Sequence, residues 1–159
     1  MKYRVIACNM FQHEVETAAR RSPHELSFTY FELGEHARPA ALRNNLQQAI
    51  DETVDADGIL LCYGLCGRAT DGLTAGKVPV ILPRSHDCGG ILLGCRKRFE
   101  TIFKPMPSTP FSSVGIIEHG EYFFSDGDLI LGDGYDELIA KYGEDNAKYI
   151  YDAMHPRLD

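Results

Sequence analysis

The sequence predicts an α/β protein with an open, mostly parallel sheet and helices on both faces, a three-layer arrangement of the Rossmann-like or flavodoxin-like kind. Segments with strand and helix patterns alternate along the chain from residue 2 to residue 103. The stretches "GILLC" and "VPVIL" are almost continuously apolar, as is typical of strands buried on both faces. Together these two observations favour a parallel sheet over an antiparallel one.

The apolar periodicity places each element in turn. We expect strands at 2–8, 26–33, 57–64 and 78–82, and helices at 11–20, 38–54 and 89–103. In the helix at 38–54, Pro39 suits the first turn, and Leu42, Leu46 and Ile50 follow at helical spacing. Beyond it we expect one short strand within 112–124. Residues 133–155 are expected to form one helix, or two helices broken at Gly143.

Composition limits the function classes. The chain has 159 residues, of which 44% are hydrophobic and 25% charged, as in a soluble single-domain protein. The net charge of -7 argues against binding to nucleic acids or anionic membranes. No apolar run approaches the length of about 20 residues that a membrane span needs. The first residues form a predicted strand instead of a signal peptide, so we expect a cytoplasmic protein. Because the chain ends just after a helix, we also expect a C-terminally shortened unit.

Thiols collect where the predicted strands end. Cys8 ends the first strand, Cys62 and Cys66 lie at the end of the third, and His86 and Cys88 follow the fourth. In open α/β sheets, ligands bind at the carboxyl ends of the strands. In a cytosolic chain, five cysteines are better explained by metal, reactive or core thiols than by disulfides.

The leading interpretation is a mononuclear metal site rather than an iron–sulfur cluster. Thiolate and imidazole ligands suit zinc or iron, and the best set is Cys8, Cys66, His86 and Cys88. Cys62 is an alternative to Cys8, but its place inside an apolar strand favours a buried core thiol. Cys95 falls within the predicted helix at 89–103, where packing is its expected role.

Two other interpretations stay open. Cys88 precedes a predicted helix and could be a nucleophilic thiol assisted by His86 or Arg84. Asp87 would then be either a catalytic group or simply the helix N-cap. The glycine-rich loop containing Gly67 and Arg68 could bind an anionic cofactor or substrate, although it matches no phosphate-binding fingerprint.

Several motifs resemble the family catalogued as domain of unknown function 1638. The resemblance rests on an apolar strand running into Y-G-L-C-G, on a later G-L pair, and on a P-x-V-I-P-R-x-H-D-C segment. The matching positions are Tyr63, Gly64, Leu65, Cys66, Gly67, Gly72, Leu73, Pro79, Arg84, His86, Asp87 and Cys88. Cys8 and Glu14 match an opening A-C segment followed by Glu. Cys95 stands where the family tends to have Ser, and "RATD" replaces a more usual N-G type of loop.

The resemblance implies a context more than an activity. Members of the family look like companions of corrinoid-dependent methyl transfer in anaerobes, which implies a role in one-carbon metabolism. The implied partner is a corrinoid protein or a methyltransferase, with a small molecule as substrate. In that setting the metal would activate a thiol for methyl or thiol transfer, and Glu14, Arg84 and Asp87 would orient ligands or contact substrate. A non-catalytic metal-binding module that docks on such a partner is the main alternative.

Overall fold

The computed structural model describes residues 1–65, 67–107, 111–119 and 135–154. The chain divides into two compact units, Met1–Gly120 and Glu121–Asp159. The expectation of a single domain stays a prediction.

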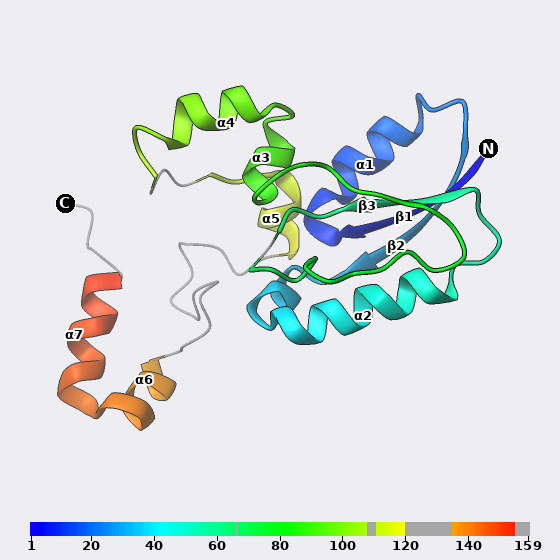
Figure 1. Cartoon of the computed structure of the whole chain (residues 1–159). Helices are drawn as coiled ribbons and strands as arrows, with labels where there is room; N and C mark the ends of the chain where they lie inside the picture. Colours follow the sequence, from blue (N-terminus) through cyan, green and yellow to red (C-terminus); the bar gives the residue numbers. More distant parts are fainter. Residues whose placement is uncertain (66, 108–110, 120–134, 155–159) are drawn as a thin grey trace. The chain divides into compact units, whose positions relative to one another are not determined.

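The first unit is built on a parallel sheet (Figure 1). Its four strands lie in the order β2-β1-β3-β4, and every neighbouring pair is parallel. The strands are β1 (Lys2–Cys8), β2 (Glu25–Phe31), β3 (Gly58–Cys62) and β4 (Val80–Ile81). The predicted class and the position of each strand are confirmed, but β4 is shorter than the strand expected at 78–82.

Helices cover both faces of this sheet. Figure 1 shows α1 (Gln12–Ala19) on one face and α2 (Pro39–Glu52) on the other. Short 3-10 turns precede these helices: η1 (Asn9–Phe11) and η2 (Leu33–Ala37). Three further helices complete the unit: α3 (Cys88–Leu92), α4 (Arg96–Phe103) and α5 (Val114–His119). The result is the predicted three-layer α/β arrangement.

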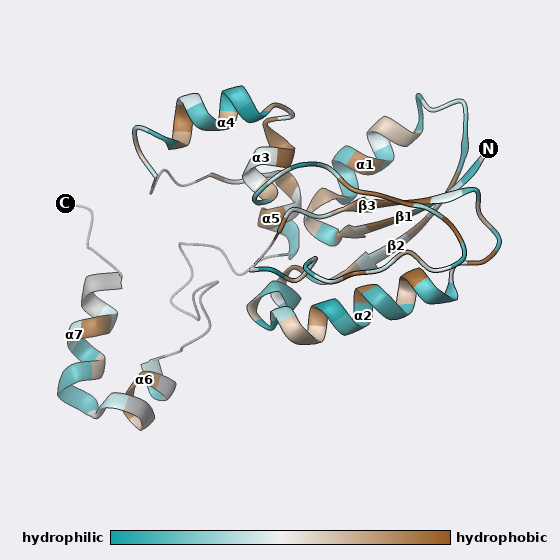
Figure 2. Ribbon diagram, in the orientation of Figure 1, coloured by the Kyte–Doolittle hydropathy of each residue, from teal (hydrophilic) through white to brown (hydrophobic). Residues whose placement is uncertain are grey.

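The core lies between the central strands and α2. Leu42, Leu46 and Ile50 repeat at helical spacing and are at most 1% exposed, as the sequence pattern predicts. The core also includes Ile6 and Ile59, which are fully buried on the two central strands. In Figure 2 the central strands are mostly brown, whereas α2 alternates between teal and brown along its length. Burial of this apolar stripe holds α2 on the sheet.

The connection from β3 to β4 takes the place that a crossover helix often occupies. Its described residues form no regular helix and run along α2. The side chain of Gln47 donates to the carbonyl of Thr74 at 3.1 Å and accepts from its N–H at 2.9 Å. Arg43 donates to the carbonyl of Arg68 at 2.7 Å. Side chains of α2 therefore satisfy backbone groups that a helix would satisfy internally.

Two sequence predictions are wrong in this unit. The helix expected at 89–103 is two helices, α3 and α4, because Gly94 has a φ of 66° and interrupts the helical backbone. The short strand expected within 112–124 is not formed at 114–119, where α5 lies; the rest of that range extends beyond the described residues. Gly115 of α5 meets the backbone of Met10 so closely that a Cβ there would clash. The tertiary contact explains the glycine, which the sequence pattern could not.

The described part of the second unit, residues 135–154, is a helical pair. Helices α6 (Tyr135–Tyr142) and α7 (Glu144–Met154) are separated by Gly143, whose φ is 78°. The ring centroids of Tyr135 and Tyr151 lie 5.1 Å apart. Of the two alternatives expected from the sequence, one helix or two, the structure has two, and the break is at the predicted glycine.

Candidate functional site

The loops that follow β3 and β4 are joined at the carboxyl edge of the sheet. The backbone N–H of Leu65 donates to the carbonyls of Ser85 at 3.3 Å and His86 at 3.0 Å. A Cβ added to Gly64 would lie 2.8–2.9 Å from backbone atoms of Asp87, which is too close for any side chain. Gly64, the first glycine of the YGLCG motif, is therefore required for contact with the HDC motif. Two motifs that are separate in the sequence thus form one structural feature at this edge.

Cys8 lies at the same edge, at the end of the neighbouring strand β1. It is 7% exposed, and its Sγ lies 3.7 Å from Oδ1 of Asn9. Side chains alternate between the two faces of a strand, so Cys8 shares a face with Ile6. Cys62 pairs in register with Ala7 and therefore lies on the opposite face. This alternation separates the two cysteines that the sequence left as alternatives.

Cys62 belongs to a different group of side chains. Tyr30 and Cys62 both pair with Ala7, from strands on either side of it. The small side chain of Ala7 leaves them near each other, and the charge of Glu16 on α1 acts on Tyr30, so they lie on the face that α1 covers. Burial raises the pKa of the Cys62 thiol. The pKa of Tyr30 is raised to about 12, first by burial and then by the charges of Glu16 and Cys62. These shifts favour the protonated thiol, in keeping with a core role.

Asp87 shapes the backbone around Cys88. Helix α3 begins at Cys88, and the Asp87 side chain accepts a hydrogen bond from the N–H of Gly90 at 2.9 Å. The hydroxyl of Ser85 donates to the carbonyl of Asp87 at 2.8 Å. The N-cap role considered for Asp87 is confirmed, and it fixes the direction in which the chain enters α3. Cys88 itself is partly exposed.

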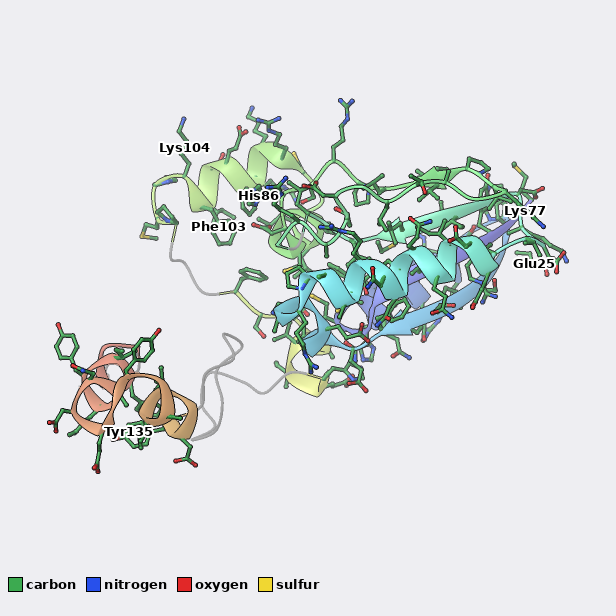
Figure 3. All side chains as sticks on the ribbon, turned by 60° about the horizontal axis from the view of Figure 1, so that its bottom comes forward. Glu25, Lys77, His86, Phe103, Lys104 and Tyr135 are labelled. Atoms are coloured by element: carbon green, nitrogen blue, oxygen red, sulfur yellow. The ribbon has the colours of Figure 1, made fainter. Side chains whose placement is uncertain are left out.

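His86 lies on the loop before α3 with its side chain turned to solvent (Figure 3). The side chain is 82% exposed, and Nδ1 is 3.7 Å from Oδ2 of Asp87. Among the described residues, no group of three or more His, Cys, Asp or Glu side chains is arranged to hold a metal ion. Cys66 lies outside those residues. The four-ligand set of Cys8, Cys66, His86 and Cys88 therefore stays a prediction.

A cleft of about 950 Å³ opens beside the HDC motif. Its walls come from the segments after β3 and β4, at 64–65, 70 and 82–87, and from α3, α4 and their connection, at 90–91, 94–96 and 99–100. Arg84, His86 and Asp87, all singled out from the sequence, are part of the lining. The cleft has the position and the size that ligand sites in open α/β sheets commonly have.

Cys8 and Cys88 do not line the cleft, and neither do three other singled-out residues. Glu14 is exposed in the first turn of α1. Arg68 has a φ of 70°, is mostly exposed, and pairs with Asp71 at 2.7 Å. Gly67 has a φ of 63° and packs near Pro39. In the structure, Gly67 and Arg68 thus form a turn against the start of α2, and their role in anion binding stays a prediction.

Beside Glu14, His13 links α1 to α5. Its Nε2 lies 2.6 Å from Oε2 of Glu118. The hydrogen bond and the charge of Glu118 raise the pKa of His13 above its ordinary value. The pair is solvent-exposed on both sides, so its contribution to stability is small.

Cys95 is the residue that sequence reasoning misplaced. A packing role inside one long helix was expected; instead, Cys95 is exposed, directly precedes α4, and lines the cleft. Backbone N–H groups of Arg98 and Lys97 lower the pKa of its thiol. The signal that could have revealed this is Gly94, which ends α3 and leaves Cys95 at the start of a new helix.

Comparison with known proteins gives a family but no characterised relative. A family model described as "Protein of unknown function (DUF1638)" matches residues 30–157. No curated protein matches the chain. No solved structure matches it either. Across the described ranges, every helix is too short or too polar to serve as a membrane span.

Proposed function

Because the chain belongs to the DUF1638 family, which is described as having unknown function, we propose a function from its own residues. We propose that the protein binds one zinc or iron ion at the carboxyl edge of the sheet, through Cys8, Cys66, His86 and Cys88. We further propose that this site acts in, or serves, the transfer of methyl or thiol groups. The cytoplasm is the proposed location.

One observation carries the metal proposal, namely the junction of the YGLCG and HDC motifs. Leu65, which precedes Cys66 in the sequence, donates its N–H to the carbonyl of His86. Gly64 contacts the backbone of Asp87, which precedes Cys88. The backbone next to Cys66 is thus within hydrogen-bonding distance of the backbone of the HDC motif. A junction of this kind supports shared ligation by cysteines from the two loops.

Cys8 and His86 extend the set in different ways. Cys8 is buried at the end of β1, and β1 is hydrogen-bonded to β3. Its thiol would supply a ligand shielded from water. His86 is mostly exposed, so ligation requires rotation of its side chain away from solvent. When bound, zinc or iron would supply a Lewis acid that keeps a sulfur atom in its reactive thiolate form.

Two observations support the proposal of methyl or thiol transfer, namely the family resemblance and the cleft. The resemblance implies that members accompany corrinoid-dependent methyl transfer, so the proposed partner is a corrinoid protein or a methyltransferase. The cleft beside His86 offers a route for a small substrate. An accessory module would hold the metal with four protein ligands, whereas an enzyme would keep one position open for substrate.

Metal content tests the first part of the proposal. Anaerobically purified protein is expected to carry one zinc or iron per chain by elemental analysis. Cys66→Ser and Cys88→Ser should each lower this stoichiometry sharply, because loss of one thiolate weakens a four-ligand site. Cys8→Ser should have a similar effect.

Cys95→Ser is the matched control, because Cys95 is exposed and directly precedes α4. It should retain the metal of the wild type. A wild type without stoichiometric metal, or equal losses in Cys95→Ser and Cys88→Ser, would contradict the proposal. Circular dichroism of each variant separates loss of metal from loss of fold.

A metal-free thiol enzyme is the second candidate. It is favoured by the partial exposure of Cys88 at the start of α3. In that case Cys88 should react with iodoacetamide faster than Cys62, which is half-buried on β3 and whose thiol pKa is raised by desolvation. Equal and slow reaction of both thiols would argue against it.

A further inference from the structure

Several exposed or half-buried apolar side chains line the cleft. Leu65 is 39% exposed and Leu82 is 46% exposed, and both line it. Ile91 and Phe99 add apolar surface from α3 and α4. Apolar side chains that remain accessible around one cavity favour a ligand with an apolar body.

Most charged side chains that line the cleft form ion pairs or hydrogen bonds with neighbouring residues. Arg96 pairs with Glu100 at 2.7 Å within α4. Asp87 accepts from the N–H of Gly90 and lies 3.7 Å from His86. Arg84 is exposed and, within the described part of the chain, makes no hydrogen bond or ion pair. Of the described arginines that line the cleft, Arg84 is therefore the one whose charge has no partner.

We propose that this cleft binds a small organic anion, with the acid group on Arg84 and an apolar body against Leu65, Leu82 and Phe99. A guanidinium group forms paired hydrogen bonds to planar oxyanions, so a carboxylate or a phosphate ester would suit it. The binding uses none of the four proposed metal ligands for its charge. A failure of the metal proposal would therefore not by itself contradict this one.

Calorimetric titration of the full chain tests the proposal with three probes: benzoate, phenyl phosphate and inorganic phosphate. We expect benzoate or phenyl phosphate to bind with one site per chain, and inorganic phosphate to bind more weakly than phenyl phosphate because it lacks an apolar body. The tighter of the two organic probes identifies the acid group. Arg84→Ala should raise the dissociation constant of that probe about tenfold, as expected for loss of a charge-assisted hydrogen bond.

Arg98→Ala is the matched control. Arg98 lies on α4, is exposed, and does not line the cleft, so its loss changes the net charge equally. Affinity should be unchanged in this variant. Cys95 gives a second readout, because it lines the cleft and its alkylation by neutral iodoacetamide can be followed by peptide mass spectrometry. In Arg84→Ala without ligand, the alkylation rate of Cys95 should equal that of the wild type, which shows that the cleft is intact.

Three results would overturn the proposal. The first is no binding of either organic probe below about 10 mM. The second is an equal loss of affinity in Arg84→Ala and Arg98→Ala, which would indicate general surface charge. The third is inorganic phosphate binding as tightly as phenyl phosphate, which would remove the role of the apolar walls.

Discussion

At the scale of single residues, glycines record close contacts that the sequence alone does not explain. Gly64 does not have a positive φ, so its backbone conformation would accept other residues. Its requirement comes from space, since backbone atoms of Asp87 occupy the position of a Cβ. The glycine thus belongs to the contact between two loops and not to a turn.

Gly64→Ala is expected to destabilise the protein by about 1–3 kcal/mol, the usual cost of forcing extra atoms into a packed contact. Urea unfolding followed by circular dichroism measures this. Gly34→Ala is the control, because nothing lies within 4 Å of a Cβ added there and its φ is also not positive. Its stability should change by less than about 0.5 kcal/mol. Equal stability of the two variants would show that the loop contact is loose.

At the scale of elements, the connection between β3 and β4 depends on the outer side of α2. Gln47 hydrogen-bonds both the N–H and the carbonyl of Thr74, as one strand does to another. The sequence predicts α2 from its apolar face and gives no sign that the polar face also has a structural role. Gln47 and Gln48 look equivalent in the sequence, but only Gln47 contacts the connection.

Gln47→Ala should lower the free energy of unfolding by about 1–2 kcal/mol, because two backbone groups of Thr74 lose their partner. It should also speed hydrogen exchange of the Thr74 amide. Gln48→Ala removes only an exposed bond to Glu52 within the helix, so the expected loss is about 0.2–0.5 kcal/mol. If Gln48→Ala cost as much as Gln47→Ala, the connection would not depend on α2 in this way.

At the scale of the whole first unit, the strand order concentrates stability on β1. This strand pairs with β2 over seven positions and with β3 over five, and Val5, Ile6 and Ala7 are at most 3% exposed. At the other extreme, β4 pairs with β3 over two positions, and Ile81 is 54% exposed. The proposed metal site and the cleft therefore lie between the most extensively paired strand, β1, and the weakly paired edge strand, β4.

Hydrogen exchange should reproduce this gradient. Amides of Ile6 and Ala7 are expected to exchange at least about a hundredfold more slowly than those of Val80 and Ile81, after correction for intrinsic rates. Exchange resolved by residue, measured by nuclear magnetic resonance, gives the comparison. Similar protection in β1 and β4 would mean that the edge strand is held by contacts beyond its two pairings with β3.

The sequence by itself determined the α/β class, the parallel sheet and the positions of the first helices and strands. Local periodicity suffices there, because a buried face imposes its spacing on each element regardless of distant partners. It also placed the helix break at Gly143, and it predicts that Cys8 and the HDC motif follow strands at the same edge, since parallel strands end together.

Only the tertiary structure decided which neighbours those residues have. It placed Cys8 and Cys62 on opposite faces, split α3 from α4 at Gly94, and moved Cys95 from an expected core position into the wall of the cleft. It also joined Gly64 to Asp87 and left Arg84 available within the cleft. These features depend on contacts between segments far apart in the chain, and the spacing of residues within one segment carries no record of such contacts.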